Sequence, residues 1–220
     1  MTSARYLNFH GIGEPGRALE PGEHELWIEP SSFEGIVSAV AERPEVHLTF
    51  DDANASDHSH ALPVLLEHDL HATFFVLSGR LDRPGSLTSS QVRELASAGM
   101  SIGTHGMHHI SWRKLDPALR VDELRTARLT LEDLVQRPVR QASLPFGQYD
   151  ARTLRQLIAE RYEHVLTSDG YWRRGTGLVI PRRTIHRNDT AEAIHRLVEH
   201  PPTLPLRAVG AAKQSIKIRR

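Results

Sequence analysis

Residues 72–77 read Ala-Thr-Phe-Phe-Val-Leu, a nearly uninterrupted apolar run between His71 and Ser78. A strand of this kind is typical of a parallel sheet whose two faces are both covered by other elements. Similar short strand-like runs alternate with helix-like segments along the chain, which is the pattern of an α/β fold. With about seven strands and about six helices, the sequence predicts an irregular or incomplete (β/α) barrel of parallel strands rather than an open sheet.

The predicted elements fill most of the chain. Strands are expected at residues 6–9, 46–50, 72–77, 100–104, 141–144, 164–167 and 178–185. Helices are expected from residue 31 or 32 to 42 and at 58–68, 91–98, 116–136, 150–160 and 190–199. Residues 1–205 are therefore predicted to form a single domain, followed by a basic C-terminal tail at 206–220.

The composition describes an ordinary globular protein. The 220 residues include 27 Lys and Arg against 27 Asp and Glu, and 39% are hydrophobic. A net charge of zero removes the attraction on which binding to a phosphate backbone depends, so nucleic acid is not expected as a partner. Because the chain has 14 histidines and no cysteine, a metal site would have to use His, Asp, Glu or water as ligands.

The N-terminal residues do not have the pattern of an export signal. No apolar stretch follows a basic start in residues 1–16. No window of the chain approaches the roughly 20 apolar residues of a membrane span. The expected location is therefore the cytoplasm, with no integral membrane span.

Polar clusters follow three of the predicted strands. They are Asp51-Asp52 after the strand at 46–50, His105 and His109 after the strand at 100–104, and Pro145-Phe146-Gly147 after the strand at 141–144. The carboxyl ends of parallel strands lie on one face of a barrel, so we expect these clusters to meet there.

Two of these clusters suggest a metal site. If the segment after His105 is helical, His109 lies on the same face with its Cβ about 5–6 Å away; the alternative is a chance spacing. Asp51 and Asp52 either enter one pocket where the strand ends or form a turn that caps the next helix. Together, one aspartate and two histidines would supply three ligands and leave positions open for water and substrate.

These residues resemble motifs of the polysaccharide deacetylase family, also called NodB-homology proteins or carbohydrate esterase family 4. Residues 49–52, Thr-Phe-Asp-Asp, are similar to the TFDD motif of the family, and residues 105–109, HGMHH, to its HxxxH motif. Residues 143–150, SLPFGQYD, resemble the third motif, usually Arg-x-Pro-Tyr-Gly. The resemblance covers roughly residues 6–189.

The resemblance implies a metal-dependent amide hydrolase with a NodB-like barrel. It implies that Asp51 is the general base. It also implies that Asp52, His105 and His109 hold a divalent metal ion, usually zinc, with cobalt, nickel or manganese as alternatives. This agrees with the general chemistry, in which a metal lowers the pKa of bound water and a base accepts its proton.

The resemblance also implies which residues contact the substrate. Pro145, Phe146 and Gly147 would line the acyl pocket, and a backbone N–H near Phe146 would help to stabilise the oxyanion. His10, at the end of the first strand, would line the same rim. Asp169 resembles the aspartate of a fourth motif, which would orient the acid or bind a sugar hydroxyl.

Two positions depart from the family pattern. Ser143 replaces the arginine of the third motif that pairs with the catalytic aspartate, and residues 179–186, VIPRRTIH, replace a late Leu-x-His motif. Some relatives carry a Pro-Arg pair on the last strand, so Arg182 is our candidate to pair with Asp51; the alternative is a surface arginine. His186 shares a face of the extended strand with Arg182 and is our candidate proton donor to the leaving amine, the alternative being a solvent-facing histidine.

The sequence therefore predicts removal of an N-acyl group, with acetyl expected, from an amino sugar or glycan intermediate. The absence of an export signal favours a soluble intracellular, lipid-linked or nucleotide-linked sugar. Deformylation or hydrolysis of another non-peptide amide is an alternative, and so is a catalytically degenerate carbohydrate-binding homologue. Retention of both Asp51 and Asp52 argues against the degenerate protein, because binding alone needs no free base beside the metal. Trp112 is expected either to stack on a sugar ring or to be packed.

Overall fold

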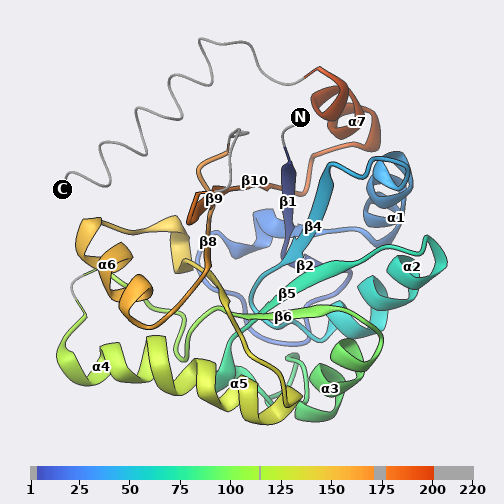
Figure 1. Ribbon diagram of the computed structural model, residues 1–220. Coiled ribbons are helices and arrows are strands. Elements are labelled where there is room, and N and C mark those ends of the chain that lie inside the picture. The colour runs from blue at the N-terminus through green and yellow to red at the C-terminus, as the bar shows by residue number, and fades with distance from the viewer. Residues whose placement is uncertain (1–3, 114, 171–176, 201–220) are drawn as a thin grey trace.

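The computed structural model of the protein describes residues 4–113, 115–170 and 177–200 (Figure 1). Its strands are β1 (Arg5–Phe9), β2 (Gly11–Ile12), β3 (Trp27–Ile28), β4 (Val46–Phe50), β5 (Ala72–Val76), β6 (Ser101–Thr104), β7 (Gln141–Ser143), β8 (His164–Thr167), β9 (Val179–Pro181) and β10 (Arg183–Thr184). Its α-helices are α1 (Pro30–Val40), α2 (Leu62–Glu67), α3 (Ser89–Ser97), α4 (Pro117–Val121), α5 (Ala127–Val135), α6 (Ala151–Ala159) and α7 (Ala191–Glu199).

The strands form a nearly closed parallel barrel. The sheet has eight strands in the order β10-β1-β4-β5-β6-β7-β8-β9, and each neighbouring pair is parallel. The two edge strands are consecutive in the chain and are separated only by Arg182, so one bent segment pairs with β8 through its first half and with β1 through its second half. The predicted irregular barrel is confirmed. The predicted strand at 178–185 is present as these two short segments.

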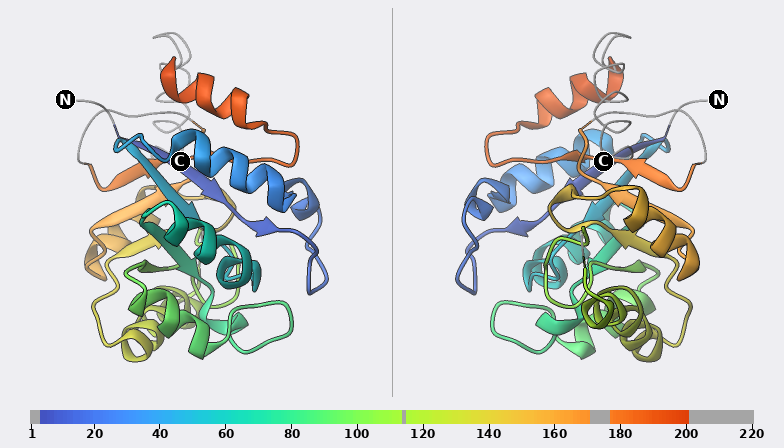
Figure 2. Two further views of the ribbon diagram at one scale, coloured as in Figure 1. Left: turned by 90° about the vertical axis from the view of Figure 1, so that its right-hand side faces the viewer. Right: turned by 90° about the vertical axis from the view of Figure 1, so that its left-hand side faces the viewer.

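The main core lies between the barrel and the helices outside it. Phe50 on β4 stacks against Phe9 and Phe74 of the neighbouring strands, with ring centroids 5.3 and 4.6 Å apart. Helix α7 lies beside α1 in both views of Figure 2, and its Ile194 belongs to the same apolar cluster as Phe33 of α1. These contacts cover the outer face of the strands that carry the site.

Helix boundaries differ from the predictions where local geometry changes. The predicted helix at 116–136 is α4 and α5 joined by a π-helical turn at Asp122–Thr126. Helix α1 begins at Pro30, not after Ser31 or Ser32, because proline at the first turn needs no hydrogen-bonded N–H. Thr88 caps α3 through reciprocal hydrogen bonds with Gln91, so this helix begins at Ser89, two residues before the predicted start at 91.

The short parallel pair of β2 and β3 was missed by the sequence analysis. It ties residues 11–12 to residues 27–28, with Gly13 N–H donating to the Ile28 carbonyl. Gly11 lies so close to the Trp27 ring that a Cβ there would fall 2.0 Å from it. This pairing fixes both ends of the intervening Gly- and Pro-rich segment, which forms part of the site wall described below.

Within the described residues, no helix combines the length and apolar character needed to cross a membrane. The predicted tail at 206–220 lies outside the described residues.

Candidate active site

Asp51 and Asp52 follow β4 at the carboxyl end of the barrel. On a continuing strand the two side chains would point to opposite faces. Asp52 and Ala53 instead have positive φ angles of 77° and 56°, so the chain turns directly after Asp51. Both carboxylates are 2% exposed and line one cavity of about 400 Å³, named the central cavity below.

His105 and His109 reach the same cavity through a loop, not through a helix. Gly106 has a φ of 91°, and a Cβ there would lie 2.2 Å from a carboxylate oxygen of Glu123, so this turn requires glycine. The buried Glu123 accepts backbone N–H groups of Met107 and His108 at 3.0 and 2.9 Å. The helical geometry on which the prediction rested is therefore wrong, although the two imidazole centroids do lie 5.3 Å apart.

Trp112 is packed and does not line the cavity. It is 1% exposed, and its Nε1–H donates to Glu123 at 3.1 Å. Of the two alternatives for Trp112, the structure shows packing, and the ring supports the loop that carries the two histidines. Glu123 itself was not singled out from the sequence, because a glutamate in a helix-like segment carries no sign that it will cap a distant loop.

Asp52, His105 and His109 form a group that can hold a metal ion. Their ligand atoms lie within 4.8 Å of one another, and Asp52 Oδ1 is 3.4 Å from Nε2 of each histidine. The other ring nitrogen, Nδ1, faces the Ser143 carbonyl at 2.9 Å in His105 and both oxygens of Glu20 at 2.9 Å in His109. Protons on Nδ1 leave both Nε2 lone pairs directed at one point.

The environment of Asp52 fits a cation. Its Oδ1 is buried and has no hydrogen-bond partner among the described residues, which is costly for a carboxylate unless something positive binds there. Burial alone would raise its pKa, but His105, His10 and His109 hold the pKa of this carboxyl well below its usual range. One carboxylate and two imidazole nitrogens form a donor set suited to a divalent metal of the zinc type.

Asp51 is paired instead with Arg182. The guanidinium donates to Oδ1 at 2.9 Å and to Oδ2 at 2.7 Å, and Asn8 and Ser143 each donate to Oδ2 at 3.0 Å. Burial opposes ionisation of Asp51, but the adjacent Arg182 and His105 hold its pKa well below its usual range. Asp51 is thus a buried carboxylate kept ionised by a bidentate ion pair.

The break between β9 and β10 places Arg182 inside the barrel, where it is 0% exposed. Ser143 occupies the predicted position of the missing third-motif arginine, and its Oγ accepts from Arg182 at 2.7 Å. Asn8 and Thr49 also accept from the guanidinium, at 2.7 and 3.2 Å. The small Ser143 side chain therefore contacts both members of the pair, and the surface alternative for Arg182 is wrong.

Two further histidines border the central cavity. His10 is 8% exposed, and its Nδ1 has no hydrogen-bond partner among the described residues. Burial holds the pKa of His10 below its ordinary value despite the nearby aspartates, which favours the neutral ring. His186 is exposed, follows β10 by two residues and lines the cavity together with Thr184.

The third-motif loop contributes mainly Phe146. This residue has a φ of 57°, is 55% exposed and lies with its ring centroid 4.5 Å from that of His109. Pro145 and Gly147 are buried and are not among the residues that line the central cavity, so their contribution to an acyl pocket stays a prediction. Asp169 also lies outside the cavity lining, and its carboxylate accepts the hydroxyls of Tyr149 at 3.1 Å and Thr167 at 2.8 Å.

One wall of the central cavity comes from a segment that the sequence analysis did not single out. Its lining residues are Glu20, Pro21, Gly22, Glu23 and Leu26. Arg80 pairs with Glu20, and Arg17 bridges Glu23 and Asn54. No strand end or motif marks this segment in the sequence, so its place at the site became visible only in the folded chain.

Comparison with known proteins places this geometry in a family. The sequence profile described as Polysaccharide deacetylase matches residues 39–165, more than half of the chain. The chain belongs to the polysaccharide deacetylase family. The resemblance seen in the sequence is therefore confirmed.

Individual relatives are more distant. The chain is 27% identical over 177 residues to YxkH of Bacillus subtilis (strain 168), which carries a provisional description as a polysaccharide deacetylase, covering 74% of this chain and 63% of that protein. It is 23% identical over 154 residues to a peptidoglycan-N-acetylglucosamine deacetylase of Bacillus cereus, covering 64% of this chain and 53% of that protein. The chain thus spans less than two thirds of the length of these relatives.

The fold is shared with solved structures. The Streptococcus pyogenes deacetylase PplD, solved in complex with acetate, superposes with a TM-score of 0.77 at 22% identity. The match covers 92% of this chain and 99% of that chain. At this identity the likeness concerns the barrel fold.

Proposed function

We propose that the protein is a metal-dependent hydrolase that removes an N-acyl group, with acetyl expected, from an amino sugar within a glycan. The observation that carries the proposal is the arrangement of two adjacent carboxylates in the central cavity. Asp52 faces two imidazole nitrogens, while Asp51 faces Arg182. Membership of the polysaccharide deacetylase family supports the reaction class, as does the name of the Bacillus cereus relative.

Asp52, His105 and His109 would hold the metal. A divalent ion bound there, zinc or else cobalt, nickel or manganese, would polarise the amide carbonyl and lower the pKa of a bound water. Glu20 and the Ser143 carbonyl hold the two imidazoles in the orientation that this binding needs. These residues thus define a preformed half of the site.

Asp51 acts as the general base. It accepts a proton from the attacking water, whose oxygen forms a bond to the acyl carbon. Arg182 keeps the carboxylate ionised before the reaction and, together with Asn8 and Ser143, fixes its orientation. Arg182 therefore takes the role that an arginine in the third motif has elsewhere in the family.

The carbon–nitrogen bond then breaks, and the leaving nitrogen must gain a proton to depart as an amine. Two imidazoles outside the metal group face the cavity, His10 and His186. The surroundings of His10 favour its neutral form, which suits a hydrogen-bonding contact with the substrate. His186, at the mouth of the cavity, is the proposed proton donor.

The acyl group is proposed to bind beside Phe146. Its exposed ring lies next to His109, and a backbone N–H near Phe146 is the proposed oxyanion donor. Pro145 and Gly147 set the shape of this loop from beneath, and Asp169 holds two hydroxyl groups behind it. The space beside Phe146 determines whether the pocket accepts an acetyl group or only the smaller formyl group.

The test combines metal content with acyl release. Purified protein should retain about one equivalent of zinc or cobalt after dialysis and should release acetate faster than formate from paired N-acetyl and N-formyl sugars. The Asp52→Ala and His105→Ala variants should lose both properties, whereas the exposed Glu14→Ala variant should keep them. A wild-type protein that binds no divalent ion at saturation would contradict the proposal, and faster formate release would select the deformylase alternative.

A further inference from the structure

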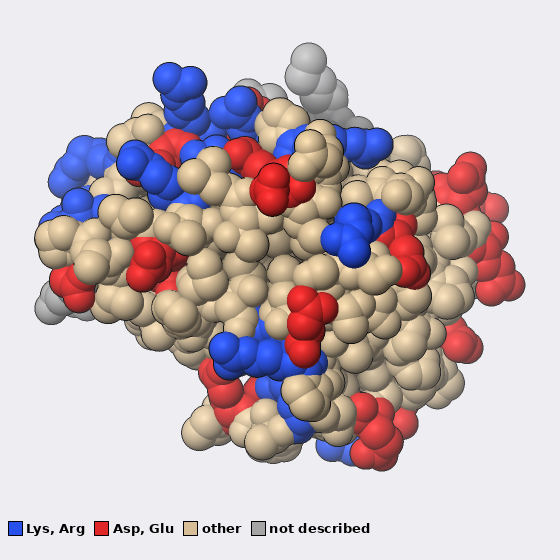
Figure 3. All heavy atoms as spheres, turned by 90° about the horizontal axis from the view of Figure 1, so that it is seen from below, with Lys and Arg blue, Asp and Glu red and all other residues tan. Residues whose placement is uncertain are grey.

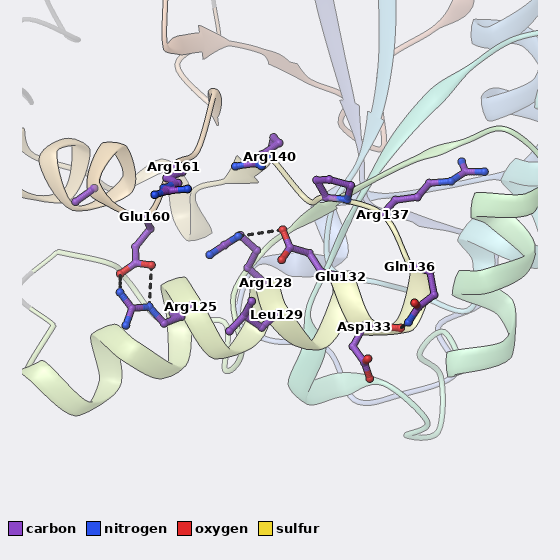
Figure 4. Close-up of a pocket in the computed structure, with 12 residues that line it drawn as sticks. Arg125, Arg128, Leu129, Glu132, Asp133, Gln136, Arg137, Arg140, Glu160 and Arg161 are labelled. Carbon is purple, nitrogen blue, oxygen red and sulfur yellow. Dashed lines mark hydrogen bonds and ion pairs between the residues drawn. The ribbon is translucent and has the colours of Figure 1, made fainter.

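A second hollow, named the arginine hollow, lies away from the central cavity. Its volume is about 820 Å³ (Figure 4). It is lined by Arg125, Arg128, Leu129, Glu132, Asp133, Gln136, Arg137, Pro138, Arg140, Ala159, Glu160 and Arg161. Five of these twelve side chains are guanidinium groups, although the whole chain has a net charge of zero. Positive charge is therefore concentrated in the arginine hollow.

The hollow lies at the opposite end of the barrel from the central cavity. Arg140 directly precedes β7, and Arg161 precedes β8 by three residues, so both mark the amino ends of parallel strands. The catalytic candidates follow the carboxyl ends of such strands. Figure 3 shows the molecule from below the view of Figure 1, where α5 lies, and basic side chains gather there in separate groups. The hollow is thus a separate surface feature.

Two of the five arginines are already paired. Arg125 donates two hydrogen bonds to Glu160, at 3.0 and 2.8 Å, and Arg128 donates to Glu132 at 3.0 Å. Glu132 also accepts the backbone N–H of Val139 at 3.0 Å. The Arg125–Glu160 bonds join the π-helical turn before α5 to the segment that leads into β8. The Glu132–Val139 bond joins α5 to the segment that leads into β7, so the hollow has a fixed wall.

The other three arginines have no acidic or hydrogen-bonding partner for their side chains in the part of the chain that the structure describes. They are Arg137, Arg140 and Arg161. Asp133 is the one carboxylate of the hollow that is not engaged in a described ion pair. Once the internal pairs are subtracted, three positive charges face one negative charge. The hollow therefore offers guanidinium donors to an anion from outside.

The free arginines are spread along the hollow. In Figure 4, Arg140 and Arg161 lie on the side of Glu160, whereas Arg137 extends in the other direction, past Gln136. Arg137 also lines a smaller neighbouring hollow together with Arg93 of α3. Positive groups thus follow the amino-terminal rim of the barrel, an arrangement that suits a chain with repeated anionic groups better than a single small anion.

We propose that the arginine hollow binds an anionic polysaccharide chain through carboxylate or phosphate groups spaced along that chain. Guanidinium groups bind both kinds of oxyanion in a bidentate way. The choice of a glycan rests on the proposed function, because an enzyme that acts on a glycan has that polymer, or a neighbouring chain, next to its surface. The hollow would hold the polymer at a distance from the central cavity and raise its local concentration there.

The lining of the hollow argues against two other polyanions. No aromatic side chain lines it in the described part of the chain, so bases of a single-stranded nucleic acid would find nothing to stack on. A bilayer surface is flat, whereas this surface is concave, and its one large exposed apolar side chain is Leu129. A flexible, hydrophilic and charged polymer fits these features better.

The test measures direct binding, independently of catalysis. A fluorescein-labelled oligogalacturonide is titrated with wild-type protein at low and physiological salt and followed by anisotropy. The variant R137Q/R140Q/R161Q should bind at least about tenfold more weakly, with a smaller dependence on salt. The control R83Q/R187Q/R196Q removes three exposed arginines outside the hollow and should bind like the wild type. The Asp133→Asn variant should bind more tightly.

Two comparisons separate this proposal from the catalytic one. The Asp52→Ala variant should bind the oligogalacturonide normally, so loss of hydrolysis alone leaves the proposal standing. Undiminished binding by R137Q/R140Q/R161Q would overturn it, and so would equal affinity for neutral chitohexaose. Tighter binding of an oligothymidylate or of phosphatidylglycerol vesicles, lost in the same variant, would assign the hollow to nucleic acid or membrane instead.

Discussion

The two halves of the central cavity differ although their key residues are adjacent in sequence. Asp51 and Asp52 are equally buried, at 2% exposure. Asp51 receives hydrogen bonds from Arg182, Asn8 and Ser143, whereas Oδ1 of Asp52 receives none in the described structure. Asp51 is thus held by hydrogen-bond donors of the protein, whereas Asp52 is surrounded by imidazoles that can hold a cation together with it.

The two halves also differ in what they contribute to the fold. Removing one member of a buried ion pair leaves an uncompensated charge. Asp52 receives no hydrogen bond at Oδ1, and its charge is balanced by nearby histidines, so its removal should cost less stability than the removal of Arg182. Substitutions on the Asp51 side should therefore lower stability, and substitutions on the Asp52 side should lower metal affinity with a smaller loss of stability.

The largest expected effect comes from Arg182→Ala. Loss of the guanidinium leaves Asp51 buried without its counter-charge, and we expect the free energy of unfolding to fall by about 3–5 kcal/mol. Turnover should fall as well, because the base loses its orientation. Urea unfolding and acetate release measure the two effects. The neighbouring Arg183→Ala variant is the matched control, since Arg183 forms only a partly exposed pair with Asp189, and an equal loss in both variants would contradict the account.

The Asp52→Asn variant should show the opposite pattern. We expect metal affinity to fall by more than about 100-fold, while the unfolding free energy of the metal-free protein falls less than in Arg182→Ala, because Asp52 has imidazole neighbours but no bidentate counter-ion. Calorimetric titration with zinc and urea unfolding in a chelator test this. The Asp57→Asn variant is the control, because Asp57 is also buried, with an unpartnered Oδ1, but is not part of the ligand group. Strong destabilisation by Asp52→Asn would remove the distinction between the halves.

A smaller effect is expected from Glu20→Gln. The Glu20 carboxylate holds Nδ1 of His109 and pairs with Arg80, so its neutral amide should weaken the orientation of that ligand. We expect metal affinity to fall by about 10–100-fold, with the glycan KM less affected than the metal requirement. Glu14→Gln removes an exposed carboxylate of the same segment and should have no effect. Unchanged metal affinity in Glu20→Gln would show that Glu20 lines the cavity but does not orient His109.

Acidification should weaken the stabilising ion pair between Asp51 and Arg182. The folded pKa of Asp51 is lowered, so its ion pair stabilises the protein above the unfolded pKa of about 4 and loses this contribution as the pH falls below it. The difference in unfolding free energy between metal-free wild type and Asp51→Asn should stay constant near neutral pH and shrink below about pH 4. A difference that is independent of pH throughout would show that the carboxylate is not selectively stabilised in the folded state.

Much of the fold and part of the site could be predicted because they depend on short-range patterns. The apolar run at 72–77 and the alternation of elements gave the barrel, and the ends of β4 and β6 located Asp51, Asp52 and His105. Arg182 was proposed from the Pro-Arg pair that some relatives carry on the last strand, and His186 from the two-residue period of that strand. In each case the signal is local in sequence and the consequence follows from strand geometry.

The remaining features depend on contacts between distant segments. Glu20 reaches His109 across 89 positions, and Glu123 fixes the loop after His105 from the turn between two helices. The helical spacing assumed for the two histidines failed because Gly106 and Glu123 hold an irregular loop there. The predicted role of Asp169 stays a prediction, and its carboxylate accepts the hydroxyls of Tyr149 and Thr167.

We propose that Asp52 binds the metal and that Asp51 accepts the proton. The most direct measurement is zinc binding and acetate release in the Asp51→Asn and Asp52→Asn variants, each checked for folding by circular dichroism. We predict that Asp51→Asn binds zinc with nearly the affinity of the wild type but releases no acetate. Asp52→Asn should lose both zinc binding and acetate release. Loss of zinc in Asp51→Asn, or tight zinc binding in Asp52→Asn, would contradict it.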